Sequence, residues 1–360
     1  MKNGFSARAY KFVMKRSGHT NTVCPRRADS TIRKYARLFF TLIPAAVICL
    51  MTGCSRGYIS SYSDNINKSS YSLTTVSADF CSFVPLLMED TAVPGEGAAM
   101  DIGDVYAAGL FDLDGGKTVI EENLTKKLYP ASMTKIMTAL LAIKYGDPKQ
   151  KITASSSVTK LEWEAQRIGI EPGDKMTLEQ ALNYLMVYSA NDAAILIAET
   201  IGKDYNDFIR MMNEEAARLG ATNTHFVNPH GLHNAEHYTT PYDLFLIFRE
   251  CLKYPEFRAL MNQGYYSTSF KSKAGEARYI EVPSTDNYLT GASDPPAGIR
   301  VLGGKTGTTD QARSCLIILS ENADGREFIS TVFGAPDHAS LYVSMNRLLR
   351  QERVYTADTK

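Results

Sequence analysis

Three short segments carry side chains that could act together in catalysis: Ser132-Met-Thr-Lys135, Ser189-Ala-Asn191 and Lys305-Thr-Gly307. A serine hydroxyl is a weak nucleophile until a neighbouring base accepts its proton. A lysine can be that base where its surroundings lower its pKa. The residue types therefore point to chemistry at a serine, provided that the fold brings the three segments together.

Each segment is short enough to recur by chance. Ser157-Val-Thr-Lys160 repeats the first pattern, whereas Ser63-Asp-Asn65 and Ser344-Met-Asn346 repeat the second. Ser157 follows a Ser/Thr-rich loop with no apolar helix behind it, Ser63 precedes the folded body, and Ser344 falls in a predicted final helix. Lys-Thr-Gly occurs once, so order and context favour the first set.

The element that must position Ser132 is a helix with the periodic apolar residues Ile136, Leu140 and Ile143. Lys135 lies one turn beyond Ser132 on the same face of that helix. The first turn of a helix has unpaired N–H groups and a positive potential. Negative charge developing near Ser132 is therefore favoured there.

The remaining pattern predicts an α+β fold. Asp114-Gly115 and Asp324-Gly325 are hairpin turns between strand-like runs near both ends of the body. Between and after them lie predicted helices at 178–187 (opened by a Thr177/Gln180 capping box), 192–201, 204–219 and 338–350. Because no regular βαβ repeat occurs, we expect a mostly antiparallel sheet with a helical region and not a doubly wound parallel sheet.

The N-terminal segment has the features of an export signal. Residues 1–53 contain ten Lys/Arg and one acid, Asp29, a net charge of +9. An apolar stretch, 38–51, follows the basic one and is too short for a comfortable membrane span. Residues 51–54 also resemble a bacterial lipobox, which makes Cys54 a candidate lipidation site. An ordinary signal peptide or an uncleaved anchor is the alternative.

The rest of the chain divides by composition. Residues 54–97 are predicted to form a flexible tether, 98–350 the folded body and 351–360 a tail. Residues 54–360 contain 29 basic and 38 acidic groups, and this excess of acid argues against nucleic-acid binding. Beyond Cys54 only Cys81, Cys251 and Cys315 remain, which is no disulfide framework and provides no Cys-x-x-Cys zinc site.

The amino-acid sequence around the three segments resembles that of the serine D-alanyl-D-alanine carboxypeptidases, the low-molecular-mass penicillin-binding proteins (peptidase S11). The similarity covers about residues 100–350. It is carried by Tyr129-Pro-Ala-Ser132-Met-Thr-Lys135-Ile-Met-Thr-Ala139, Tyr188-Ser-Ala-Asn191-Asp-Ala193, Phe226-Val-Asn-Pro-His-Gly-Leu232, His237-Tyr-Thr-Thr-Pro-Tyr-Asp-Leu244, Gly304-Lys-Thr-Gly307 and Val332-Phe-Gly-Ala-Pro336.

The resemblance implies the fold of serine β-lactamases and penicillin-binding proteins, a mostly antiparallel sheet flanked by helices with a helical subdomain. It implies an enzyme that removes the terminal D-Ala of peptidoglycan stem peptides and that β-lactams inhibit. Ser132 would be the acylated nucleophile and Lys135 its base. Ser189 would relay a proton, and Asn191 would hold Lys135 and the substrate.

The resemblance also assigns the third segment to substrate binding. Lys305 and Thr306 would hold the terminal carboxylate of the substrate. Glycines such as Gly307 would let the substrate approach the strand, and the N–H groups of Ser132 and Thr308 would form the oxyanion hole. No metal or organic cofactor is implied.

Two places depart from the family pattern. Arg313 stands where the family has a glycine, so it either strains a tight turn or adds a cation for the substrate carboxylate. Residues 284–289 match only loosely a motif that precedes Lys-Thr-Gly in the family. Both departures bear on substrate preference more than on the type of reaction.

Four other functions remain open. His233-Asn-Ala-Glu236-His237 spells a zinc-peptidase motif, but Pro229, Gly231 and Pro241 favour a loop over the helix that this motif needs. A β-lactamase uses the same three segments, yet no Glu-x-x-x-Asn follows Asn191. A DD-endopeptidase or a non-catalytic sensor of β-lactams or peptidoglycan would share the same segments.

Overall fold

The computed structural model describes Gly95 and residues 97–358. The predicted export signal, Cys54, Cys81 and nearly all of the predicted tether lie outside the described residues. Within the described part, strands and helices follow one another in the order of an α+β protein, with hairpins at both ends and most helices between them.

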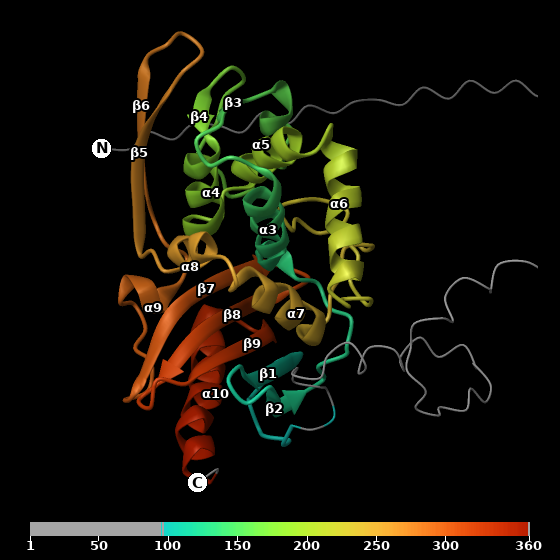
Figure 1. Ribbon diagram of the computed structural model, residues 1–360, viewed down its shortest axis with the longest axis vertical. Coiled ribbons are helices and arrows are strands. Elements are labelled where there is room, and N and C mark those ends of the chain that lie inside the picture. The colour runs from blue at the N-terminus through green and yellow to red at the C-terminus, as the bar shows by residue number, and fades with distance from the viewer. Residues whose placement is uncertain (1–94, 96, 359–360) are drawn as a thin grey trace, which may run out of the picture. The chain divides into compact units, whose positions relative to one another are not determined.

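A five-stranded sheet with the strand order β2-β1-β9-β8-β7 forms the base of the molecule (Figure 1). All of its paired strands are antiparallel, as the hairpin signals predicted. The third predicted segment, Lys305-Thr-Gly307, lies on β7, the strand at one edge of this sheet. The strands are β1 (Ala107–Asp112), β2 (Lys117–Glu122), β7 (Ile299–Thr309), β8 (Arg313–Asn322) and β9 (Glu327–Ala335).

Alternating residues of this sheet face two separate cores, because successive strand side chains point to opposite faces. On β8, Cys315 and Ile317 pack toward the helical part, whereas Leu316 and Ile318 pack toward α10 (His338–Asp358). Residues 351–358, predicted as part of a tail, instead continue α10. The apolar pattern ends near Leu349, but the buried Glu352 keeps the helix against the sheet through a 2.7 Å hydrogen bond from Ser320 Oγ.

Helices cover the other face of the sheet and surround the segment that contains Ser132. The predicted helices and the Thr177/Gln180 capping box are present. The helices are η3 (Ala131–Thr134, 3₁₀), α3 (Lys135–Tyr145), η4 (Ser156–Thr159, 3₁₀), α4 (Leu178–Val187), α5 (Asn191–Ile201), α6 (Tyr205–Arg218), α7 (Pro241–Cys251), α8 (Pro255–Met261) and the short α9 (Asn287–Thr290).

A second, four-stranded sheet flanks the helices, with the order β3-β4-β5-β6. Its hairpin of β5 and β6 extends along one side of the molecule (Figure 1). The sequence did not reveal this hairpin, because most of its side chains are polar or half-exposed. The strands are β3 (Lys151–Thr153), β4 (Lys175–Thr177), β5 (Tyr265–Lys271) and β6 (Ala277–Pro283).

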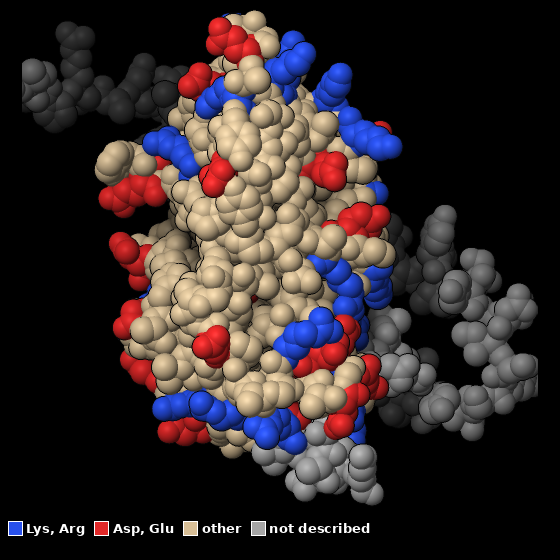
Figure 2. All heavy atoms as spheres, turned by 90° about the vertical axis from the view of Figure 1, so that its left-hand side faces the viewer, with Lys and Arg blue, Asp and Glu red and all other residues tan. Residues whose placement is uncertain are grey.

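Three further features of the described residues are the surface charge, the cysteines and the character of the helices. Figure 2 shows the face on the side of the β5–β6 hairpin, where acidic and basic side chains are interspersed around a broad uncharged centre. Cys251 and Cys315 are buried free thiols. Of the helices formed by the described residues, none combines the length and the apolarity needed to cross a bilayer.

Candidate active site

The backbone around Ser132 is held in a strained turn. Ser132 lies in η3, directly before α3, and Ala131 has φ +47°. A positive φ costs a residue with a Cβ roughly 1–2 kcal/mol, so neighbours must hold the turn. Thr134 Oγ1 donates to Ala131 O at 2.8 Å, and His237 Nε2 lies 2.7 Å from Thr134 Oγ1. These contacts brace the peptide that presents the serine.

Lys135 is the centre of the site. Its side chain is fully buried. Its Nζ lies 2.8 Å from Ser132 Oγ, 2.7 Å from Asn191 Oδ1 and 2.7 Å from His230 O. The fold thus joins the first two predicted segments at one nitrogen, and it adds a backbone carbonyl from a third loop.

The identity of these three partners decides what the amine can do. Asn191 Oδ1 and His230 O can only accept hydrogen bonds, so each takes an N–H of Lys135. Ser132 Oγ can either accept or donate. A neutral Lys135 would therefore use its two N–H groups on the two carbonyls and direct its lone pair at the Ser132 hydroxyl, which is the arrangement of a general base.

The electrostatics favour that neutral amine. Burial and the positive charge of Lys305 hold the pKa of Lys135 well below its usual value, while Asp192 opposes this shift. Asp192 itself is buried at the start of α5 and accepts backbone N–H groups from Gly169 at 2.9 Å and Ile170 at 2.8 Å. The surroundings therefore favour a neutral Lys135, and backbone N–H groups solvate the nearby Asp192 carboxylate.

Ser189 lies in the second strained turn of the site, with φ +66°. Its hydroxyl is buried and makes no hydrogen bond with any described residue. The turn is held on both sides by Gln166, whose Nε2 donates to Tyr188 O and whose backbone carbonyl accepts Asn191 N at 2.8 Å. A buried, unpaired hydroxyl on a braced turn is a group available to a ligand.

The third segment places a second buried lysine beside the first. Lys305 on β7 donates to Thr306 O at 2.9 Å, and burial lowers its pKa to about 7 while Asp286 opposes the shift. Thr306 Oγ1 lies 2.6 Å from Thr285 Oγ1. The loosely matching segment at 284–289 thus reaches the site by the contact of Thr285 with Thr306 and by the charge of Asp286 near Lys305.

Gly307 serves the protein's own packing. An ideal Cβ there would lie 2.8 Å from Pro130 O and 3.0 Å from Ser132 N. The glycine therefore lets β7 lie directly against the turn that contains Ser132. Cβ atoms at Gly303 and Gly304 would likewise meet protein backbone, at Met261 O and Ile317 O. The expectation that these glycines also let the substrate approach the strand stays a prediction.

The end of β7 carries Thr308, whose Oγ1 lies 3.3 Å from His338 Nε2 at the start of α10. Beyond it, Arg313 has φ +56°, a backbone conformation that a glycine, the residue of the family pattern, would adopt without strain. Its guanidinium lies 4.7 Å from the Tyr106 ring centroid and 3.7 Å from Asp104 Oδ2. Arg313 therefore strains the turn and is directed at Tyr106.

Sequence comparison agrees with this geometry. The profile of the peptidase S11 family, described as D-alanyl-D-alanine carboxypeptidase, matches residues 101–337. The chain belongs to this family.

Individual family members show the same relationship. D-alanyl-D-alanine carboxypeptidase DacF of Bacillus subtilis is 33% identical over 64% of this chain and 58% of its own length, and DacC of Escherichia coli is 30% identical over 68% of this chain and 60% of its own. The chain thus spans about three fifths of these relatives. The crystal structure of the Streptomyces K15 DD-transpeptidase is 26% identical with a TM-score of 0.62, covering 70% of this chain and 96% of that one.

The zinc-peptidase motif of residues 233–237 has a different structural role in this protein. Residues 233–237 lie outside any helix, as the nearby prolines and glycine predicted. His237 Nδ1 accepts Val227 N at 3.1 Å, so its Nε2 carries the proton that reaches Thr134. Burial lowers the pKa of His237 to about 3. This histidine therefore uses both ring nitrogens to brace the turn before Ser132.

Sequence reasoning missed three contributors to the site. The His230 carbonyl contacts Lys135, and the buried ring of the same residue braces its loop by accepting Leu232 N at 3.2 Å. A backbone carbonyl leaves no signature in a sequence. Thr285 and Asp286 had a weak signal, their position in the segment that precedes Lys-Thr-Gly in the family.

Proposed function

We propose that this protein is a serine DD-carboxypeptidase, a hydrolase that removes the terminal D-Ala of peptidoglycan stem pentapeptides through an acyl-enzyme on Ser132. The observation that carries the proposal is the buried Lys135, held 2.8 Å from Ser132 Oγ by two pure acceptors. Family membership supports the same reaction.

In the first step, Ser132 Oγ attacks the carbonyl carbon of the penultimate D-Ala and Lys135 accepts the hydroxyl proton. The N–H groups of Ser132 and Thr308 would stabilise the oxyanion. Their elements lie side by side, since a Cβ at Gly307 would be 3.0 Å from Ser132 N. Loss of one such donor typically costs a factor of about 10²–10³ in rate.

In the second step, the proton passes from Lys135 through Ser189 to the amine of the departing D-Ala, and water then releases the acyl group. The unpaired Ser189 hydroxyl suits this relay because no described residue competes for it. Lys305 and Thr306 would hold the terminal carboxylate. A β-lactam would enter in the same way and stop as the acyl-enzyme.

The test is mass spectrometry of protein treated with penicillin, together with D-Ala release from diacetyl-Lys-D-Ala-D-Ala. We expect one adduct on the peptide containing Ser132, lasting much longer than seconds, and release of D-Ala. Rapid loss of the adduct would indicate a β-lactamase, and binding without release a sensor. An adduct elsewhere, for example at Ser157, would refute the proposed site.

We further propose that the enzyme acts outside the cytoplasmic membrane, attached through a lipid on Cys54. The support is the basic and apolar leader followed by residues 51–54. Labelling with a radioactive fatty acid should mark the wild-type protein and spare Cys54→Ala. Absence of label on the wild type would leave an ordinary signal peptide or an uncleaved anchor as the explanation.

A further inference from the structure

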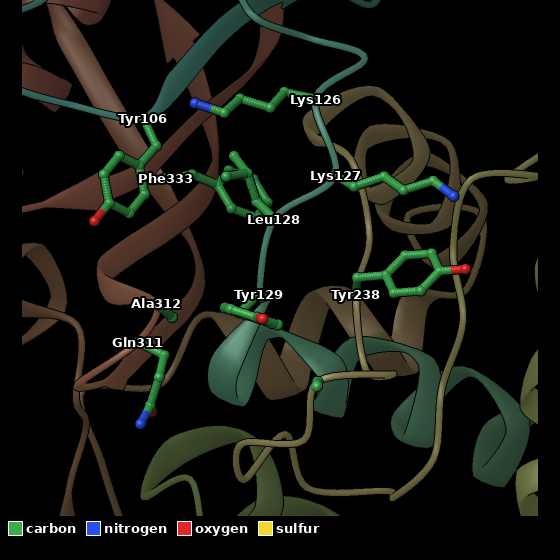
Figure 3. A pocket seen from close by; sticks show the side chains of 10 residues that line it. Tyr106, Lys126, Lys127, Leu128, Tyr129, Tyr238, Gln311, Ala312 and Phe333 are labelled. Atoms are coloured by element: carbon green, nitrogen blue, oxygen red, sulfur yellow. The ribbon is translucent and has the colours of Figure 1, made fainter.

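A pocket of about 400 Å³ lies beside the candidate active site, outside its catalytic residues (Figure 3). We call it the Tyr106–Tyr238 pocket. It lies between the segment that leads into Ser132, the loop after His237 and the hairpin that follows β7. It is lined by Tyr106, Lys126, Lys127, Leu128, Tyr129, Ala235, Tyr238, Gln311, Ala312 and Phe333.

The pocket combines cations with aromatic rings. Figure 3 shows Lys126 directed toward Tyr106 and Lys127 toward Tyr238, and their Nζ atoms lie 5.6 and 4.5 Å from the two ring centroids. Arg313 approaches the Tyr106 ring as well, at 4.7 Å. None of the described residues that line the pocket is acidic. Within a body that has more acidic than basic residues, this composition favours an anionic ligand.

The position of the pocket along β7 identifies which part of the substrate could reach it. In the proposed reaction, the terminal carboxylate lies at Lys305 and Thr306, and the scissile carbonyl lies at the Thr308 N–H. The acyl half of the peptide must then extend past Thr308 toward Gln311, antiparallel to the edge strand. β7 ends at Thr309 and residues 310–312 turn into β8, so Gln311 and Ala312 lie just past the end of the strand. An extended peptide advances roughly 3.3 Å per residue, so its acyl half reaches this turn two to three residues upstream of the scissile bond.

We propose that the Tyr106–Tyr238 pocket binds a carboxylate on the acyl half of the substrate, two or three residues before the scissile bond. This inference rests on the proposed function and adds a specificity site to it. Lys126 and Lys127 supply the charge, and the tyrosines and Leu128 cover the apolar part of the peptide. The strained Arg313, which the catalytic steps do not use, packs against Tyr106, but Asp104 lies 3.7 Å from its guanidinium, so the two lysines are the main source of positive charge.

The test compares two peptides that differ in one group: N-acetyl-γ-D-glutamyl-L-Lys-D-Ala-D-Ala, with a free α-carboxylate, and the same peptide with that carboxylate as an amide. For the wild type we expect kcat/KM to be about fivefold higher for the acidic peptide, mainly through KM. In Lys126→Gln/Lys127→Gln the ratio should fall toward one. In Lys151→Gln, an exposed lysine on β3, it should stay at the wild-type value.

A wild-type ratio of one, or a ratio that persists in the double variant, would overturn the proposal. Diacetyl-Lys-D-Ala-D-Ala lacks the upstream residue and therefore tests the proposed function separately. If no peptide is cleaved, calorimetric titration of both peptides into Ser132→Ala measures the preference without catalysis. Tighter binding of the acidic peptide would support the pocket, and equal affinity would refute it.

Discussion

Two Ser-x-x-Lys segments of this chain share their spacing and a 3₁₀ turn, but only the first contains a strained residue, Ala131 with φ +47°. Ser132 lies in the 3₁₀ helix η3 and Ser157 in the 3₁₀ helix η4, and each lysine directly follows its helix. Lys135 is fully buried and contacts Asn191 and His230, whereas Lys160 is exposed. The Ser157 N–H donates to Ser155 Oγ at 3.0 Å, which is an ordinary helix cap.

The comparison shows that the Ser-x-x-Lys pattern and a 3₁₀ turn do not by themselves produce the surroundings that Lys135 has. Burial of the lysine between two acceptors, with a second lysine nearby, separates the two segments. The predictions below test whether that environment carries the function, beginning with the largest expected effect.

Replacing each serine gives the strongest contrast. Ser132→Ala should lower D-Ala release at least about 10⁴-fold and abolish the penicillin adduct, because the acyl group has no oxygen to join. Ser157→Ala should remain within about twofold of the wild type. Steady-state assays and intact-protein mass spectra measure both. Normal activity in Ser132→Ala would remove the basis of the comparison.

Replacing each lysine by arginine tests the need for a neutral base. Arginine stays protonated in proteins, so Lys135→Arg should lower the acylation rate about 10²–10⁴-fold. Lys160→Arg should have no effect. In the wild type, acylation should rise with pH and level off well below pH 10.5, because the pKa of Lys135 is lowered. A rate that still rises toward pH 10.5 would contradict a lowered pKa.

Asp286→Asn tests whether the charge of Asp286 supports the protonated form of Lys305. Burial raises the pKa of Asp286 to about 6, so above that pH its charge supports the protonated form of Lys305. Without it the pKa of Lys305 falls further, and KM for peptides with a terminal carboxylate should rise about three- to tenfold between pH 6 and 8. Unchanged KM across that range would show that Asp286 has no electrostatic role.

Glu352→Gln tests whether burial also shifts the pKa of a side chain far from the candidate active site. Burial raises the pKa of Glu352 from 4.5 to about 8, so between these values the native state holds a proton that the unfolded state releases. Wild-type stability should therefore fall as pH rises from 4.5 through 8, by on the order of 5 kcal/mol. Thermal unfolding at pH 5, 7 and 9 should show a smaller decline for Glu352→Gln. Parallel curves would mean that the native pKa is not raised.

Periodicity and turn chemistry determined much of the fold. The antiparallel strands around Asp114-Gly115 and Asp324-Gly325 and the capped helix after Thr177 were predictable, because each depends on residues close together in the chain. The β5–β6 hairpin and the continuation of α10 past residue 350 were not, because both depend on contacts with distant segments.

The sequence by itself determined which residue types could do chemistry and which copy of each motif was the better candidate. Only the tertiary structure decided how they act. It set the 2.7 Å contact of Lys135 with the His230 carbonyl, the strained turns at Ala131 and Ser189, and the direction of Arg313 toward Tyr106. A pKa depends on burial and on charges contributed by other segments, and no local string of residues encodes those surroundings.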